Sequence, residues 1–100
     1  MDWERDLPGW SLPEFSTRIV NGPHRWHVQI AGDGADLLLL AGAGASTHTW
    51  RDLIPDLAHT YRVIAPDLPG QGFTQSPNAK RSGLDETVED LTALANAEGW

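Results

Sequence analysis

The sequence contains no cysteine among its 100 residues, which excludes disulfide bonds, thiolate catalysis and thiolate zinc sites. Basic residues are scarce as well: 7 Lys and Arg stand against 14 Asp and Glu, for a formal charge of −7. A chain with this balance is not expected to bind nucleic acid or an anionic membrane surface. The absence of cysteine also suits a cytoplasmic protein, and we expect that location.

Long apolar runs are missing too. The longest covers residues 37–45, whereas a helix needs about 20 apolar residues to cross a bilayer. The N-terminal stretch MDWERDLPGW lacks the basic start and apolar core of a signal peptide. The sequence therefore predicts no transmembrane segment.

The four histidines do not have the spacing of metal ligands. His24 and His27 stand three residues apart in a predicted strand, so their side chains point to opposite faces. No H-E-x-x-H pattern is present. We expect neither a metal site nor a cofactor.

Residues 1–14 contain two prolines and two tryptophans and predict an irregular N-terminal arm whose tryptophans pack on a neighbouring surface. Two β-type segments follow, 15–20 and 25–30, separated by the turn signal NGPH. In the second segment, Trp26, Val28 and Ile30 face one way, while His27 and Gln29 face the other. The pair predicts an antiparallel hairpin.

The rest of the chain alternates strands and helices. The uniform run LLLL predicts a strand buried on both faces, as in a parallel sheet covered by helices. The last four elements then alternate, which is typical of an α/β sheet with a right-handed crossover. The predicted order is β-β-β-α-β-α. The first helix has an apolar stripe at Trp50, Leu53, Ile54, Leu57 and Ala58, and a strand at 61–65 follows it. The last helix is capped by Ser82 and ends at Gly99, and its apolar stripe contains Leu84, Val88, Leu91, Leu94 and Ala95.

The glycine loop between the LLLL strand and the next helix is the first candidate site. Gly42 and Gly44 let the backbone turn sharply and bring its N–H groups close to a ligand, and the helix start behind them favours an anion. A plain turn without a ligand explains the same glycines. The loop has no lysine for a Walker phosphate site, and Thr47 stands where a dinucleotide fingerprint needs its third glycine. Asp67, placed where a ribose-binding acid belongs, keeps a dinucleotide-binding fragment as an alternative.

The stretch DLPGQG is the second candidate. Asp67 can accept hydrogen bonds from the N–H groups of the turn, while Pro69, Gly70 and Gly72 permit its backbone shape. We interpret these four residues as loop-shaping, because Asp67 as a general base lacks a recognisable partner. His48, beside the glycine loop, either lines a pocket or faces solvent.

The segments GASTHTWRDLIPDLA and YRVIAPDLPGQGFTQSP, in this order after a buried strand, resemble the N-terminal part of an α/β-hydrolase. The resemblance implies that residues 15–100 are the N-terminal portion of one incomplete α/β-hydrolase domain. It implies that the backbone N–H of Ala43 belongs to the oxyanion hole of the substrate site. Gly42 and Gly44 then shape the turn, and His48 lies nearby in the same site. It also implies that the serine nucleophile, the acid and the histidine follow Trp100, so that this chain holds no triad residue and is inactive alone.

Within that family, RWHVQ and the same two segments look like the α/β-hydrolases that act as magnesium-chelatase accessory proteins in bacteriochlorophyll biosynthesis. The resemblance implies hydrolysis of an ester-like bond in a small-molecule substrate, with magnesium-chelatase subunits as partners. Ala41 stands where the family commonly has histidine, which leaves a non-catalytic accessory protein that binds a tetrapyrrole or a chelatase subunit as an alternative.

Overall fold

Alternating apolar residues in the first third of the chain form a β-hairpin. β1 (Ser16–Asn21) and β2 (His24–Ala31) run antiparallel, with Ile19 opposite Trp26. Gly22 turns the chain with a φ of +57°, a left-handed conformation that glycine adopts without a steric penalty. The predicted hairpin is confirmed.

The structure is a computed structural model that describes residues 3–10, 12–40, 47–68, 72–75 and 84–100.

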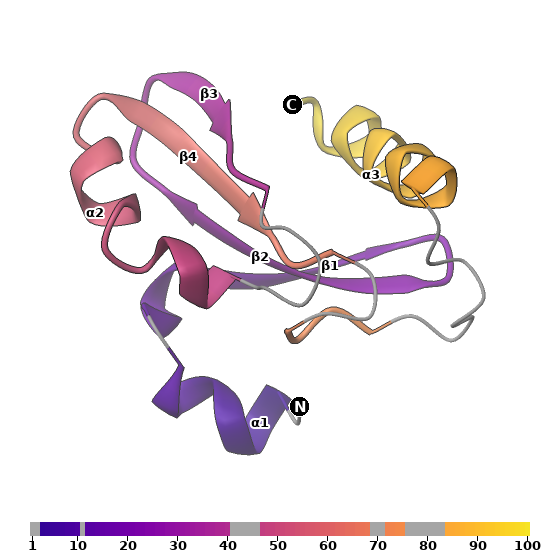
Figure 1. Ribbon diagram of the computed structural model, residues 1–100, viewed down its shortest axis with the longest axis horizontal. Helices are drawn as coiled ribbons and strands as arrows, with labels where there is room; N and C mark the ends of the chain where they lie inside the picture. Colours follow the sequence, from indigo (N-terminus) through magenta and orange to yellow (C-terminus); the bar gives the residue numbers. More distant parts are fainter. Residues whose placement is uncertain (1–2, 11, 41–46, 69–71, 76–83) are drawn as a thin grey trace.

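Two parallel strands extend the hairpin into a four-stranded sheet (Figure 1). β3 (Ala35–Leu38) pairs parallel with β4 (Tyr61–Pro66), β4 pairs antiparallel with β2, and the order across the sheet is β1-β2-β4-β3. Parallel strands need a crossover between them, and helical segments provide it here. The predicted α/β architecture, a hairpin followed by parallel strands, is therefore confirmed.

The crossover contains two short helical pieces, the 3-10 turn η3 (Thr47–Trp50) and α2 (Ile54–Leu57). Pro55 lies in the first turn of α2, where its missing N–H would have had no partner within the helix. Regular α-helix thus begins only at Ile54. Leu53 was expected on the apolar stripe but is 47% exposed, because the break between the two pieces turns it away from the sheet.

The last helix, α3 (Leu84–Glu98), ends at Gly99 with a φ of +75°, as the sequence predicts. Leu94 is fully buried and Leu91 packs beside it. Val88, which was expected in the same stripe, is 55% exposed. The reason is geometric, since Val88 lies about 120° around the helix axis from Leu94.

The sheet buries apolar residues on both faces because neighbouring residues of a strand point to opposite sides. Along β4, Ile64 packs on the face that α3 covers, whereas Val63 and Ala65 pack on the face that α2 covers. One cluster contains Trp26, Val28, Ile64 and Leu94, with Ile19, Ile30, Leu91 and Trp100 around it. The other contains Ala31, Ile54, Val63 and Ala65, with Leu12, Phe15, Leu39, Trp50, Leu57 and Ala58 around it.

The strand predicted from LLLL is less buried than expected. β3 lies at the edge of the sheet, with β4 as its neighbour on one side. Leu38 is 41% exposed and Leu40 is 45% exposed, whereas Leu39 packs into the α2-side cluster. The expectation of burial on both faces was wrong for this strand, because an edge strand lacks a second neighbour to cover its side chains.

The N-terminal arm consists of short helical pieces, α1 (Trp3–Asp6), η1 (Leu7–Gly9) and η2 (Pro13–Phe15). Figure 1 shows α1 and α3 on opposite sides of the sheet. Across the described parts of the chain, no helix combines the length and the apolar character needed to span a bilayer.

Candidate functional site

The two parallel strands end at the same edge of the sheet, β3 at Leu38 and β4 at Pro66. In open α/β sheets, ligands bind outside the carboxyl ends of the strands. Asp67 follows β4 directly, and His48 lies in the first helical turn of the crossover that leaves β3. The predicted site residues that the structure describes therefore gather near one edge. Several other predicted residues lie outside the described part of the chain: Gly42, Ala43, Gly44, Pro69, Gly70 and Ser82.

Asp67 is fully buried and its carboxylate is turned inward. Its Oδ2 accepts a hydrogen bond from the Phe73 N–H at 3.0 Å and lies 2.6 Å from Nδ1 of His27. This geometry agrees with a loop-shaping role. It also removes the observation that favoured a dinucleotide site, since a buried carboxylate that is already hydrogen-bonded does not reach a ribose.

Gly72 is required beside this carboxylate. Its φ is +52°, and a Cβ built on it would collide with Oδ2, Oδ1 and the carboxyl carbon of Asp67. Both the backbone conformation and the close approach select glycine at this position. A loop-shaping role for Gly72 stays a prediction, and this geometry supports it.

The segment after the loop is tied to β2 by further hydrogen bonds. The Thr74 hydroxyl donates to the Asp67 carbonyl at 2.6 Å and accepts from the backbone N–H of His27 at 2.9 Å. The Asp67 N–H donates to the His27 carbonyl at 2.9 Å. Arg25 and Gln75 exchange two backbone hydrogen bonds, both at 2.9 Å. Residues 72–75 are therefore held against β2 almost as an additional short strand.

His27 links this segment to the start of β1. Its Nε2 lies 2.7 Å from the Ser16 hydroxyl, which also accepts a hydrogen bond from Gln29 Nε2 at 3.3 Å. Since Nδ1 meets a carboxylate, it carries a proton and donates a hydrogen bond to Asp67. In the neutral ring, Nε2 accepts a hydrogen bond from the Ser16 hydroxyl.

Ser16, His27 and Asp67 thus repeat the connectivity of a Ser-His-Asp triad, but burial argues against catalysis. The side chains of His27 and Asp67 are both 0% exposed, so no substrate atom can approach the imidazole. A general base must lie within hydrogen-bond reach of the proton that it removes from substrate. The network supports structure, and we name it the His27 relay, defined by Ser16, His27, Asp67 and Phe73.

Sequence reasoning did not select Ser16 or His27. A signal was present: His27 and Gln29 share one strand face, and Trp26 and Val28 on the opposite face are buried. Polar residues on a second buried face need partners. The partner of His27 is Asp67, 40 positions away, and only the three-dimensional structure brings the two together.

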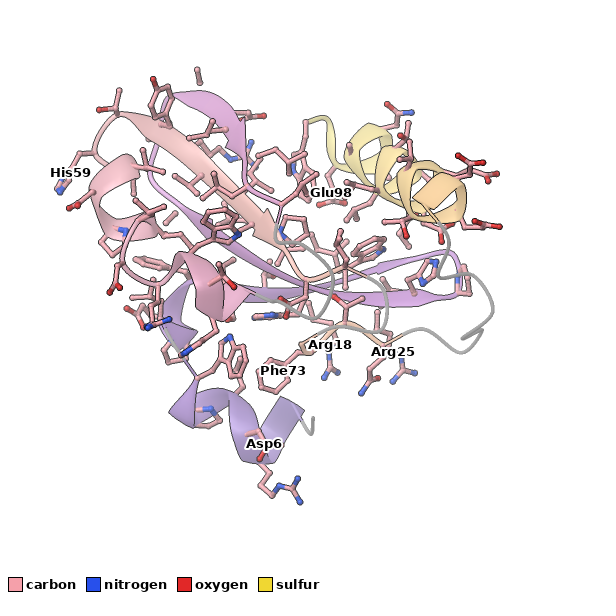
Figure 2. All side chains as sticks on the ribbon, viewed as in Figure 1. Asp6, Arg18, Arg25, His59, Phe73 and Glu98 are labelled. Atoms are coloured by element: carbon pink, nitrogen blue, oxygen red, sulfur yellow. The ribbon has the colours of Figure 1, made fainter. Side chains whose placement is uncertain are left out.

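A row of rings continues from the His27 relay toward the surface. Phe73 makes an edge contact with the His27 imidazole at 5.2 Å between centroids, and the Trp10 indole contacts Phe73 at 5.0 Å. Trp10 also contacts the exposed His48 ring at 5.4 Å. Figure 2 shows Phe73 between the sheet and the N-terminal arm. Trp10 therefore joins the two segments that follow β3 and β4.

No group of three or more His, Asp or Glu side chains within the described ranges is arranged to hold a metal ion.

His24 is one of the buried histidines, and its Nε2 lies 2.9 Å from Asp90 Oδ2 on α3. This contact joins α3 to β2 on the face opposite the His27 relay.

Comparison with known proteins places these features in context. The family model for the alpha/beta hydrolase fold matches residues 37–99. The magnesium-chelatase 30 kDa subunit of Rhodobacter capsulatus is 46% identical over 93 residues, covering 90% of this chain and 33% of the relative. A soluble epoxide hydrolase of Corynebacterium is 46% identical over 84 residues, covering 82% and 28%. The crystal structure of a meta-cleavage product hydrolase superposes with a TM-score of 0.77 at 30% identity, covering 86% and 33%. The chain thus spans about a third of the length of these relatives.

Proposed function

This chain belongs to the α/β-hydrolase family, and from that premise we propose that it is the N-terminal third of a serine hydrolase that cleaves an ester-like bond in a small molecule. The observation that carries the proposal is the parallel pair β3 and β4, whose carboxyl ends are followed by the glycine loop and by the Asp67 segment. In such a domain the glycine loop faces the reacting carbonyl. We also propose that the protein is located in the cytoplasm.

The proposed chemistry of this chain is electrostatic. The backbone N–H of Ala43 donates to the oxyanion that forms when a serine attacks the carbonyl, and Gly42 and Gly44 allow the loop to aim it. One such donor lowers the barrier by about 3 kcal/mol. The nucleophile, the acid and the histidine come from sequence beyond Trp100 in this proposal. The described residues supply a scaffold: the His27 relay fixes residues 72–75 beside β2.

A chimera tests the oxyanion donor. Residues 1–100 replace the matching third of the Rhodobacter capsulatus magnesium-chelatase 30 kDa subunit, and turnover of p-nitrophenyl esters is measured. Ala43→Pro removes the N–H and is expected to lower kcat about 100- to 1,000-fold. Ala43→Gly keeps the N–H and serves as the matched control, with kcat expected within a few-fold of the parent.

Equal turnover by the proline and glycine variants would refute the role of Ala43. The 100-residue chain alone is expected to hydrolyse no ester, and turnover by the purified chain would contradict the proposed position of the nucleophile. A folded chimera without any esterase activity would remove the hydrolase proposal altogether.

The similarity to the magnesium-chelatase 30 kDa subunit favours one second candidate, an accessory protein that binds a tetrapyrrole or a chelatase subunit without catalysis in bacteriochlorophyll biosynthesis. In a Rhodobacter capsulatus strain that lacks its own subunit, an accessory role predicts that the chimera restores pigment even with Ala43→Pro. Loss of pigment with Ala43→Pro but not with Ala43→Gly would favour the hydrolase instead.

A further inference from the structure

The tip of the β1–β2 hairpin places an asparagine directly before a glycine. Asn21 is the last residue of β1, and Gly22 follows it in the turn. The sequence has three asparagines, and the other two, Asn78 and Asn96, each precede an alanine. Because glycine has no Cβ, its backbone nitrogen is the least hindered target for the side chain of the residue before it. The hairpin tip is therefore where an asparagine side chain meets the most accessible neighbouring nitrogen.

The hairpin tip is open to water. Gly22 is exposed, and a Cβ built on it meets no described atom within 4 Å apart from its chain neighbours. Asn21 pairs with His24, and this pair is the last one of the β1–β2 ladder before the turn. Pairs at the end of a ladder open more readily than pairs in its interior. Asn21 can therefore leave its extended conformation while the rest of the hairpin stays closed.

A second turn places Asp33 before Gly34, but this turn is enclosed. A Cβ built on Gly34 would lie 2.6 Å from the Thr60 carbonyl oxygen, and one built on Gly32 would lie 2.5 Å from the Ala58 carbonyl oxygen. The backbone between α2 and β4 thus packs directly on this turn, which cannot open without displacing that backbone. The two turns differ in how easily a side chain can reach the nitrogen of the next residue, and the hairpin tip is the accessible one.

We propose that Asn21 is a modification site at which the chain deamidates spontaneously, independently of the proposed hydrolase function. The Gly22 nitrogen attacks the side-chain carbonyl carbon of Asn21, and the side-chain nitrogen leaves as ammonia, which takes up the proton that the Gly22 nitrogen loses. A water molecule then opens the cyclic imide at either of its two carbonyl carbons. The products are aspartate and isoaspartate, and in isoaspartate the main chain runs through Cβ and gains one carbon atom.

Either product places a new negative charge under α3. Asn21 shares a sheet face with its partner His24, because side chains directly opposite in an antiparallel pair point to the same side. On that face, His24 Nε2 lies 2.9 Å from Asp90 Oδ2 of α3. The helix α3 contains several acidic residues and no Lys or Arg. A carboxylate at position 21 therefore repels α3 and competes with Asp90 for His24, so deamidation loosens the helix from the sheet.

Mass spectrometry of the ageing chain tests the modification. The purified 100-residue chain is kept in mildly alkaline buffer, its peptides are mapped over time, and isoaspartate is detected by enzymatic methylation. We expect loss of the amide at Asn21, with both products present, and an intact amide at Asn96, which is exposed on α3 and serves as the internal reference. Asn21→Gln should abolish the reaction, because the larger ring that glutamine would form closes slowly. Loss of the Asn21 amide no faster than that of Asn96 overturns the inference.

Amide hydrogen exchange tests the effect on α3. Asn21→Asp reproduces the new charge without the extra main-chain carbon, and it should speed exchange of the α3 amides about 2- to 5-fold. The β4 amides should exchange at the parent rate, which shows that the fold is retained. Gln75→Glu is the matched control, since it adds the same charge beside Arg25 on the opposite face of the sheet, and it should leave α3 unchanged. Parent rates in α3 of Asn21→Asp, or equal acceleration by Gln75→Glu, would refute the loosening of the helix.

Discussion

Adding one methyl group at Gly72 tests whether Asp67 organises the segment that follows β4. Gly72→Ala has two costs: a left-handed φ of +52°, which costs an L-residue about 1–2 kcal/mol, and a collision of the new Cβ with the Asp67 carboxylate. Moving that carboxylate weakens its hydrogen bonds to His27 and Phe73. Each buried group left without its partner costs about 1–3 kcal/mol.

Gly22→Ala separates the two costs. Gly22 has nearly the same φ, +57°, but a Cβ there meets nothing within 4 Å. Gly22→Ala should therefore lower the free energy of unfolding by the conformational cost alone. Gly72→Ala should lower it by about 2–4 kcal/mol more, the cost of the displaced carboxylate.

Urea unfolding of the chain at low micromolar concentration, followed by tryptophan fluorescence, measures the difference. With a slope of about 1–2 kcal/mol/M, the midpoint of Gly72→Ala should lie about 1–4 M below that of Gly22→Ala. Equal midpoints would refute the reasoning. A second check is the double variant with Asp67→Ala: removing the carboxylate should abolish the additional cost of Gly72→Ala, and an undiminished cost would place its origin elsewhere.

Three further outcomes follow from the structure. Asp90→Asn removes the charged partner of buried His24 and should lower the free energy of unfolding by about 1–2 kcal/mol in the same urea assay, whereas Glu98→Gln on the exposed end of α3 should change it by less than about 0.5 kcal/mol. Ser16 should not react with a fluorophosphonate probe, because the imidazole beside it is fully buried; a labelled Ser16 peptide in mass spectrometry would show that the His27 relay is an accessible nucleophilic site. The exposed edge of β3 should promote self-association, so Leu38→Lys is expected to lower the sedimentation-derived association constant; an unchanged constant would exclude this edge as the contact.

The sequence predicted the hairpin and the order of elements because these depend on local patterns. The alternation from Trp26 to Ile30 and the turn at Gly22 each specify one conformation over a few residues. Burial of β3 and of Val88 was not predicted correctly, since it depends on which neighbours lie beside an element. A run of leucines shows that a strand is apolar but does not show whether it has one neighbour or two.

In the candidate site, too, features that depend on local sequence could be predicted and features that depend on distant residues could not. A loop-shaping role for Asp67 and Gly72 is predicted from turn chemistry, which is local. The partner of Asp67 is His27, which lies in another strand, and the sequence offered no means of pairing them. The position of Trp10 likewise depends on the path of the whole arm across the sheet.

The arm and the segment after β4 are connected through one hydrogen-bonded path. Gln29 donates both to the Leu12 carbonyl in the arm and to the Ser16 hydroxyl. Ser16 leads through His27 and Asp67 to the N–H of Phe73, whose ring supports Trp10. The same network therefore holds the arm at two neighbouring points, through its backbone at Leu12 and through a ring at Trp10. Since Gln29, His27 and Asp67 are fully buried, solvent cannot replace a lost partner, and a change at Gln29 or His27 is expected to weaken the fold and the support of the Trp10 ring by Phe73.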